Sequence, residues 1–166
     1  MSYDLVFTSR TGNTRLLAEE IRRTLGENDC GYFGGPEGAN LSDGAVYVGF
    51  WTDKGGCGPE MEAFLQSLHG REVFLFCTCG FGGDPDYYAG ILDRAAVHLP
   101  ADNRVIGRFA CQGKMPQPVR QRYLAMQQAG DPQGEKMLIN FDRAASHPDE
   151  ADLAALRQAV LPKQEG

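Results

Sequence analysis

The stretch LVFTSRTGNT, residues 5–14, decides the fold of this chain. It begins inside an apolar run, Tyr3–Phe7, that is rich in residues favoured in β-strands. A helical pattern follows at once, because Leu17, Ile21 and Leu25 recur every four residues. A strand, a short polar loop and a helix in this order begin a β-α-β unit, so the stretch predicts a parallel sheet.

The alternation of strand and helix continues outward from this stretch to residue 111. Short apolar runs predict four further strands, and helical spacing predicts helices between the later ones. The strands are expected over residues 30–33, 45–50, 73–77 and 105–111, and the helices from Pro59 and over 88–99. We therefore expect an α/β three-layer sandwich around a five-stranded parallel sheet in the order 2-1-3-4-5, with its ligand site beyond the carboxyl ends of the strands.

The alternation stops after this point. Residues 118–129 have helical spacing, and Ser146-His147-Pro148-Asp149 resembles the capped start of a last helix. Residues 130–145 between them are expected to form a connection that carries a small apolar cluster, Met137–Phe141. That cluster could dock a partner, although packing on the sheet's own helices is the preferred interpretation.

The length and charge of the chain limit its class. A length of 166 residues is that of one domain, for which we expect a core over 3–111 and a C-terminal helical extension over 112–166. Lys and Arg number 16 against 22 Asp and Glu, and the net charge of −6 argues against nucleic acid or an anionic membrane as partner. No apolar run approaches the roughly 20 residues of a membrane helix, and Asp4 argues against a signal peptide. The five cysteines are an odd number, and a chain of this size does not need disulfide bonds to be stable. We therefore expect reduced thiols in the cytoplasm.

The loop at residues 8–15, TSRTGNTR, has the composition of a phosphate site. Its hydroxyl and amide side chains can donate hydrogen bonds, and Gly12 permits a close approach of the backbone. The following helix adds unpaired N–H groups and the positive end of its dipole. The Walker A, dinucleotide and phosphatase patterns are all missing from the sequence. The alternative is that these residues only cap the helix, but a cap needs one of them and not five.

Residues 5–14, followed by Ala18 and Ile21, are similar to the signature of the flavodoxin family at every constrained position. The resemblance covers residues 3–111 and implies a flavodoxin-like fold that binds FMN, with hydroxyls and backbone amides of this loop around the phosphate. Arg10 departs from such loops, which often manage without a formal positive charge, and it could pair with the phosphate or point to solvent. The other phosphate-binding residues that the resemblance implies are Ser9, Thr11, Gly12, Asn13 and Thr14.

The loops after the third and fourth strands are expected to hold the flavin ring. Trp51 ends the third strand, where a flat indole could stack on the ring. The resemblance implies that a glycine peptide in this loop flips to bond flavin N5, and the candidates are Gly55 and Gly56, which follow Thr52. Phe81 could form a second ring wall, with Tyr87 and Tyr88 as alternatives. Backbone hydrogen bonds to the pyrimidine edge are implied for the next loop, with candidates Thr78, Cys79, Gly80, Phe81 and Gly83.

The motif Cys77-x-Cys79 suggests a dithiol or a metal site. We expect the two thiols to point to opposite faces of their strand, which argues against the dithiol. No further cysteine or histidine has the spacing of a zinc ligand, so we predict no metal. The three histidines lie outside the flavin loops, and we predict no catalytic residue.

These residues favour the function of an electron carrier, because no catalytic acid, base or nucleophile lies near the predicted flavin site. Asp53, Glu60, Asp84 and Asp86 lie on or beside the flavin loops, and their charge predicts a low-potential, one-electron carrier that works with a partner reductase. The alternatives are a small FMN-dependent NAD(P)H or quinone oxidoreductase and a flavin-free interaction module.

The segments GFWTDKGG, GFGGDPDYY and FACQGKMP resemble segments of flavodoxin-family proteins of anaerobic bacteria, including the subgroup associated with bilirubin reduction. This resemblance implies a redox partner that is a flavin-dependent reductase acting on a tetrapyrrole. We expect the chain to be a monomer or a weak dimer.

Overall fold

The computed structural model describes residues 2–161. Residues 162–166, at the end of the predicted extension, lie outside the described part. The strands are β1 (Tyr3–Phe7), β2 (Cys30–Gly34), β3 (Ala45–Trp51), β4 (Glu72–Cys79) and β5 (Arg104–Gln112). The helices are α1 (Asn13–Leu25), α2 (Pro59–Gln66), α3 (Pro85–Ala96), α4 (Gln117–Gln128), α5 (Pro132–Ala144) and α6 (Glu150–Val160), with a short 3₁₀ turn at Glu27–Asp29.

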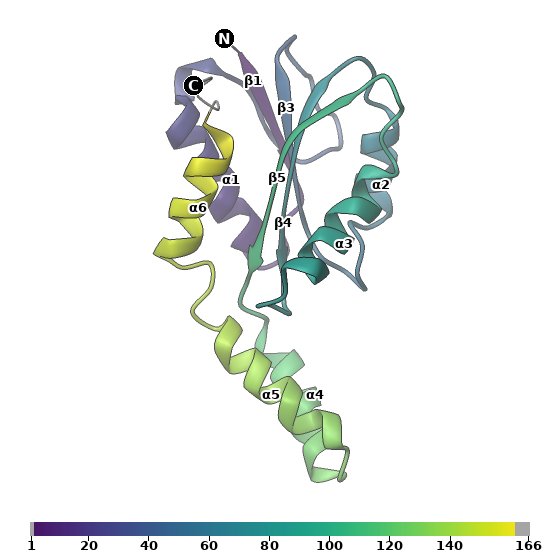
Figure 1. Cartoon of the computed structure of the whole chain (residues 1–166), viewed down its shortest axis with the longest axis vertical. Coiled ribbons are helices and arrows are strands. Elements are labelled where there is room, and N and C mark those ends of the chain that lie inside the picture. Colours follow the sequence, from purple (N-terminus) through teal and green to yellow (C-terminus); the bar gives the residue numbers. More distant parts are fainter. Residues whose placement is uncertain (1, 162–166) are drawn as a thin grey trace.

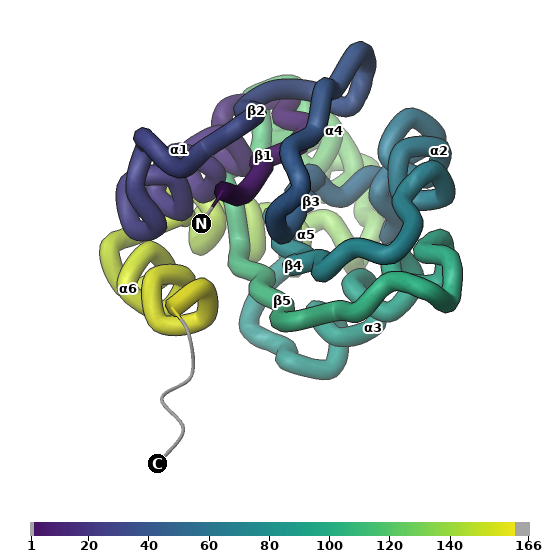
Figure 2. Tube along the Cα trace, turned by 90° about the horizontal axis from the view of Figure 1, so that it is seen from above, coloured from purple at the N-terminus to yellow at the C-terminus, as the bar shows by residue number. Residues whose placement is uncertain are grey.

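The five strands form one parallel sheet in the order β2-β1-β3-β4-β5, which confirms the predicted α/β flavodoxin-like topology. Helices α1 and α6 cover one face of the sheet, and α2 and α3 cover the other (Figures 1 and 2). Right-handed crossovers place successive helices on opposite faces once the strand order reverses beside β1. The three layers therefore follow from the alternation in the sequence.

Alternation along the strands divides the core between the two faces of the sheet. In β3, the side chains of Val46, Val48 and Phe50 pack toward α2 and α3, whereas Tyr47 packs toward α1 and α6. The strand is buried on both faces, as expected for a parallel sheet between two helical layers. The predicted strands therefore had the correct residues, and their ends differ by one or two positions.

Residues 130–145 do not form a connection, and that prediction was wrong. Pro132–Ala144 is the helix α5, whose start is capped by the Asp131 side chain, which accepts a hydrogen bond from the backbone amide of Gln133. α5 packs along α4 as a hairpin, and a Cβ atom on Gly134 would lie 2.5 Å from the backbone nitrogen of Gln127. Such a close approach needs a residue without a side chain.

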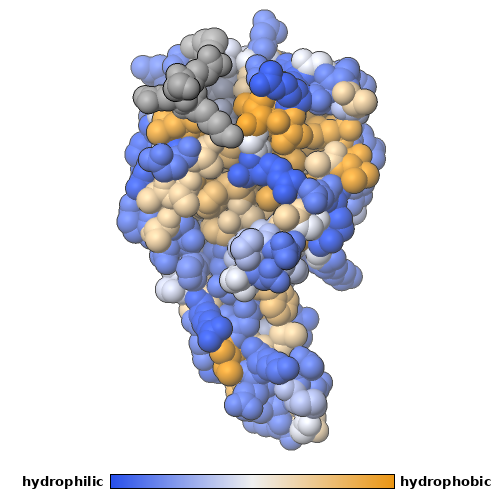
Figure 3. Space-filling view, in the orientation of Figure 1, coloured by the Kyte–Doolittle hydropathy of each residue, from blue (hydrophilic) through white to orange (hydrophobic). Residues whose placement is uncertain are grey.

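The hairpin α4–α5, called the arm below, extends past the carboxyl ends of the strands (Figure 1). Leu138 and Phe141 of the apolar cluster are buried on the α5 face that carries Gly134 and Ala144, whereas Ile139 is 47% exposed. The face of the arm seen in Figure 3 is mostly hydrophilic, with a small apolar patch. The cluster is thus used largely inside the arm, and not on the helices of the sheet.

The last helix returns to the sandwich. α6 packs against α1, and Arg157 of α6 donates a hydrogen bond of 2.8 Å to the buried Glu20 carboxylate of α1. Its cap lies later than predicted, because the capping box is made by Asp149 and Asp152 and not by Ser146. Within residues 2–161, the arm is therefore the part that departs from the three layers. No helix in the described residues is long and apolar enough to cross a bilayer.

Candidate functional site

The three predicted loops meet at the carboxyl end of the sheet and surround a cavity of about 540 Å³. This is the position beside the topological switch point where parallel α/β sheets bind ligands. The predicted residues that line the cavity are Arg10, Thr11, Asn13, Trp51, Thr52, Gly55, Thr78, Cys79, Gly80 and Phe81. The remaining predicted residues, Ser9, Gly12, Thr14, Gly56 and Gly83, lie outside its lining.

The first loop is held in shape by Ser9. Its Oγ accepts hydrogen bonds from the backbone amides of Gly12 and Arg15, at 3.2 and 3.3 Å. Gly12 has φ 93°, a left-handed conformation that a side chain would strain, and it is the N-cap of α1. Ser9 therefore shapes the turn and accepts the Arg15 amide, whereas the amides of Asn13 and Thr14, at the start of α1, have no acceptor within the helix.

Asn13 joins this loop to the segment after β5. Its Nδ2 donates to the Thr11 Oγ1 at 3.1 Å and to the Lys114 backbone oxygen at 2.8 Å. Thr11, Asn13 and Lys114 also line a smaller pocket of about 250 Å³ together with Gly12 and His147. Hydroxyl, amide and ammonium donors at a helix N-terminus form a donor set that suits a phosphate group.

Thr14 has a different place from the other hydroxyl residues. Its side chain is fully buried, and its Oγ1 lies 2.9 Å from the Oγ1 of Thr78. The pair ties the start of α1 to the end of β4. The Thr14 hydroxyl is therefore already used within the protein.

The second loop contains a tight turn. Asp53 and Gly56 exchange two backbone hydrogen bonds of 2.9 and 3.0 Å, with Lys54 and Gly55 at φ 52° and 80° between them. Positive φ at both central residues is the geometry of a type I′ turn. The Gly55 carbonyl also accepts a hydrogen bond of 2.8 Å from the Arg94 Nε. The Gly55–Gly56 peptide is thus bonded at both its oxygen and its amide.

Aromatic side chains from two of the loops line the cavity. The Arg10 guanidinium lies over the Trp51 ring, 5.5 Å from its centre. Its side chain therefore contacts the second loop, which neither of the two predicted orientations included. Phe81 is 39% exposed and meets Tyr87 edge to face at 6.2 Å. Tyr87 lines the cavity, whereas the Tyr88 hydroxyl accepts a hydrogen bond from the Gly83 amide.

The arm supplies a wall that was not predicted. Val119, Arg122 and Tyr123 of α4 line the cavity, together with Met115 and Pro116 that precede α4. On α5, Asn140 donates a hydrogen bond of 3.0 Å to the Gly80 oxygen, which Gln112 Nε2 also reaches at 3.0 Å. The signal in the sequence was the position of Lys114-Met115-Pro116 directly after a strand, at the carboxyl end where the other loops converge.

The charges around the cavity differ from the predicted ones. Asp53 is the one member of the predicted carboxylate set that lines it. Four cations line it as well, namely Arg10, Lys54, Lys114 and Arg122. The lining is therefore cationic in a protein whose net charge is −6, and it favours an anionic ligand. The carboxylates thus no longer support the predicted low potential.

The two thiols of Cys77 and Cys79 point to the same face, and the opposite prediction was wrong. Side chains of residues two apart in a strand lie on one face, because the strand has a period of two. Their sulfur atoms are 3.9 Å apart, and both residues are buried.

Among the described residues, His147, Asp149 and Asp152 are the group that could hold a metal ion, but they are joined to one another by the hydrogen bonds that cap α6.

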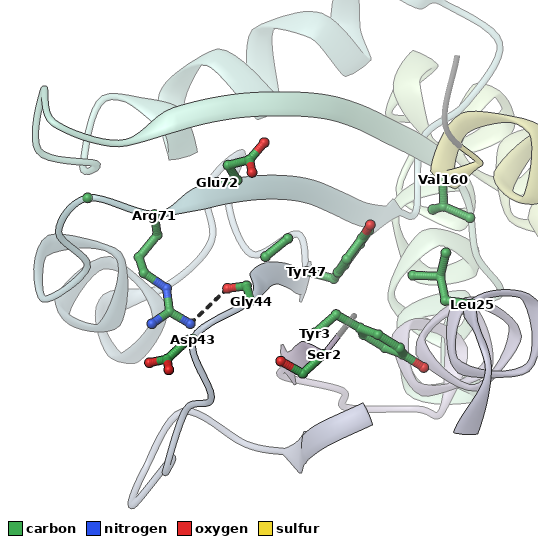
Figure 4. Close-up of a pocket in the computed structure, with 11 residues that line it drawn as sticks. Ser2, Tyr3, Leu25, Asp43, Gly44, Tyr47, Arg71, Glu72 and Val160 are labelled. Carbon is green, nitrogen blue, oxygen red and sulfur yellow. Dashed lines mark hydrogen bonds between the residues drawn. The ribbon is translucent and has the colours of Figure 1, made fainter. Parts of the chain in front are cut away.

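A second cavity, of about 420 Å³, lies at the opposite end of the sheet (Figure 4). Its lining includes Tyr3, Tyr47 and Arg71, near the amino ends of β1, β3 and β4. The Arg71 Nη2 is already engaged, because it donates to the backbone oxygens of Ser42 and Gly44 and to the Asp4 carboxylate. This end of a parallel sheet is not where ligands bind, so we assign the function to the first cavity.

Comparison with known proteins agrees with this geometry. The family model of the flavodoxin domain matches residues 4–161. The chain is 39% identical over 180 residues to the flavodoxin-like domain-containing protein BilS of Clostridium symbiosum, covering 97% of this chain and 95% of that protein. It is 30% identical to BilS of Clostridioides difficile, covering 90% and 88%.

Solved flavodoxins share the fold at low sequence identity. An archaeal flavodoxin superposes with a TM-score of 0.57 and 17% identity, covering 95% of this chain and 92% of that one. Oxidised flavodoxin 2 of Bacillus cereus superposes with a TM-score of 0.56 and 15% identity, covering 95% and 94%.

Proposed function

Because the chain belongs to the flavodoxin family, whose members bind FMN, we propose that it is an electron carrier with its flavin in the 540 Å³ cavity. The observation that carries this proposal is the convergence of three loops on one cavity, with a phosphate-type donor set at its edge. When bound, FMN supplies the ability to take up and release electrons, and the protein supplies position and charge.

The residues of the first loop fit the phosphate. The Thr11 hydroxyl reaches the cavity and is held there by a hydrogen bond from the Asn13 Nδ2. The backbone amides of Asn13 and Thr14, the first residues of α1, add donors with the favourable end of the helix dipole. Lys114 supplies a positive charge beside them. Ser9 shapes the loop by accepting hydrogen bonds from the Gly12 and Arg15 amides, and the buried Thr14 packs against Thr78.

Trp51 and Phe81 fit the two sides of a flat ring. Both line the cavity from different loops, and Phe81 is partly exposed, which would leave one side of a ring open to a partner. Of the peptides in the turn, the one between Lys54 and Gly55 is the better candidate for a flip. It lies at the centre of the turn, whereas a flip of the Gly55–Gly56 peptide would break two hydrogen bonds.

We further propose that the partner is a flavin-dependent reductase that acts on a tetrapyrrole. The support is the relationship to the proteins named BilS and the resemblance of three sequence segments to the subgroup associated with bilirubin reduction.

A second candidate function is an FMN-dependent oxidoreductase acting on a small molecule. The arm favours it, because Val119, Arg122 and Tyr123 add a wall that could hold a small molecule beside the flavin.

The experiment that separates these functions uses the purified protein loaded with FMN under anaerobic conditions. A carrier keeps its flavin oxidised when NADH or NADPH is added alone, and its reduced form passes electrons rapidly to an added one-electron acceptor. Rapid reduction by NADH or NADPH without a partner would favour the oxidoreductase. A protein that takes up no FMN would reject both in favour of an interaction module.

The cationic lining predicts the direction of a change in flavin potential. Replacing Lys114 and Arg122 with Met removes two positive charges that stabilise a reduced, anionic flavin. At about 10 Å and an effective dielectric of about 40, each charge corresponds to roughly 35 mV for one electron. The double variant is therefore expected to have a lower flavin potential, measured by redox titration against dyes.

The matched control is Arg104→Met, which removes an exposed cation at the amino end of β5, away from the cavity. Its potential should stay that of the unaltered protein. A flavin potential that stays unchanged or rises in the Lys114 and Arg122 variant would show that these cations do not stabilise the reduced flavin.

A further inference from the structure

The end of β4 brings two thiols together behind the candidate flavin cavity. Cys77 is completely buried and Cys79 is 2% exposed, yet Cys79 belongs to the lining of the cavity. Their sulfur atoms are 3.9 Å apart. Cys79 therefore lines the ligand space, and the Cys77 sulfur lies in the core beside the Cys79 sulfur.

The surroundings make the two sulfurs unequal. A hydrogen bond from the Cys77 thiol lowers the pKa of Cys79, and the Thr52 hydroxyl, 3.3 Å from the Cys79 sulfur, acts in the same direction against the opposing effect of burial. The pKa of Cys77 is raised by the same hydrogen bond and by burial. Burial also raises the pKa of Cys57, to about 11, and that of Cys111. Cys79 is thus the thiol at the cavity with the most thiolate character, and Cys77 is placed to react with it.

The backbone permits a bond between them. Residues two apart in a strand have Cα atoms about 6.6 Å apart, which is inside the range that disulfides span. The sulfurs must approach from 3.9 Å to about 2.05 Å. Cys79 is the last residue of β4, so the chain that follows it leaves the sheet.

We propose that Cys77 and Cys79 form a dithiol–disulfide couple that exchanges an electron pair with the flavin. This proposal rests on the proposed position of FMN in this cavity. In the oxidising direction, the two S–H bonds break and one S–S bond forms. The two electrons and two protons that are released are taken up by the oxidised flavin. In the reverse direction, the reduced flavin returns them and the S–S bond is cleaved. The couple would let one protein molecule hold twice the electrons of its flavin.

The first test counts thiols and does not depend on FMN. The apoprotein is treated with oxidised glutathione, denatured, and alkylated for mass spectrometry. The chain has five free cysteines, so two fewer alkyl groups are expected, with Cys77 and Cys79 in one disulfide-linked peptide. The control is Cys111→Ser, which should lose the same pair of alkyl groups. Alkylation of every cysteine after the treatment would overturn the proposal.

The second test counts electrons in the FMN-loaded protein. After the same oxidation, anaerobic titration with dithionite should consume about four electrons per flavin, against about two in the Cys77→Ser protein. Cys79→Ser serves as a second variant if Cys77→Ser does not fold. The exchange would be overturned if the disulfide forms but the titration still consumes about two electrons per flavin. It would also be overturned if the disulfide is reduced with no change in flavin absorbance.

The two proposals fail in different ways. If the loop variant Thr11→Val with Asn13→Leu keeps its FMN, the flavin is not in this cavity, and the exchange falls with it whatever the thiol count. If that variant loses FMN while all thiols of the unaltered protein remain free after oxidation, the dithiol alone is rejected.

Discussion

Replacing Thr11 with Val and Asn13 with Leu is expected to weaken FMN binding by at least about 10-fold. The change removes the Thr11 hydroxyl, which can donate to a phosphate, and the Asn13 amide, whose Nδ2 binds that hydroxyl and the Lys114 backbone oxygen. A hydrogen bond to a charged group contributes about 1.5–3 kcal/mol, so the loss of one corresponds to at least about 10-fold in the dissociation constant. The measurement is a titration of the apoprotein with FMN, followed by the quenching of flavin fluorescence.

The choice of Asn13, and not Thr14, follows from the structure. Thr14 is fully buried against Thr78, so its replacement would disturb the core and confuse a loss of binding with a loss of folding. Thr24→Val is the matched control, because the Thr24 hydroxyl bonds only the Glu20 oxygen near the far end of α1. A double variant whose affinity stays within about threefold of the control would place the phosphate elsewhere.

Replacing Arg71 with Met is expected to lower the free energy of unfolding by about 3 kcal/mol. The Asp4 carboxylate is fully buried in β1, and its Oδ2 accepts hydrogen bonds from the Ser42 amide and hydroxyl and from the Arg71 Nη2. Without the guanidinium, a buried charge loses its counter-charge, which is costly even though Arg71 itself is 19% exposed. Urea unfolding followed by circular dichroism measures the change.

Two further variants make this result specific. Arg104→Met removes an exposed arginine at the start of β5 and should unfold as the unaltered protein does. Combining Asp4→Asn with Arg71→Met removes the buried charge too, so the combined variant should be more stable than Arg71→Met alone. Equal stability of these two proteins would show that Arg71 acts through its backbone contacts to Ser42 and Gly44, and not through the Asp4 charge.

Some loop residues could be predicted from the sequence, and others could not. Thr11, Asn13, Trp51 and Phe81 stand where strands end, and parallel strands bring their carboxyl ends together. The same reasoning could not separate Thr14 from the other hydroxyl residues of its loop, because its burial depends on Thr78, which lies on β4 and is distant in the sequence. The period of a strand alone already places the Cys77 and Cys79 side chains on one face.

The alternation of apolar runs by itself determined the sheet, its order and the end at which ligands bind, because hydrophobic periodicity and right-handed crossovers are local rules. Tertiary structure alone decided the arm. The burial of Leu138 and Phe141 depends on α4 lying beside α5, and the cationic lining depends on Lys114 and Arg122 returning to loops about 100 residues away. Contacts between distant segments leave no periodic signal in a single sequence, so the walls and charges of the site appear only once the chain is folded.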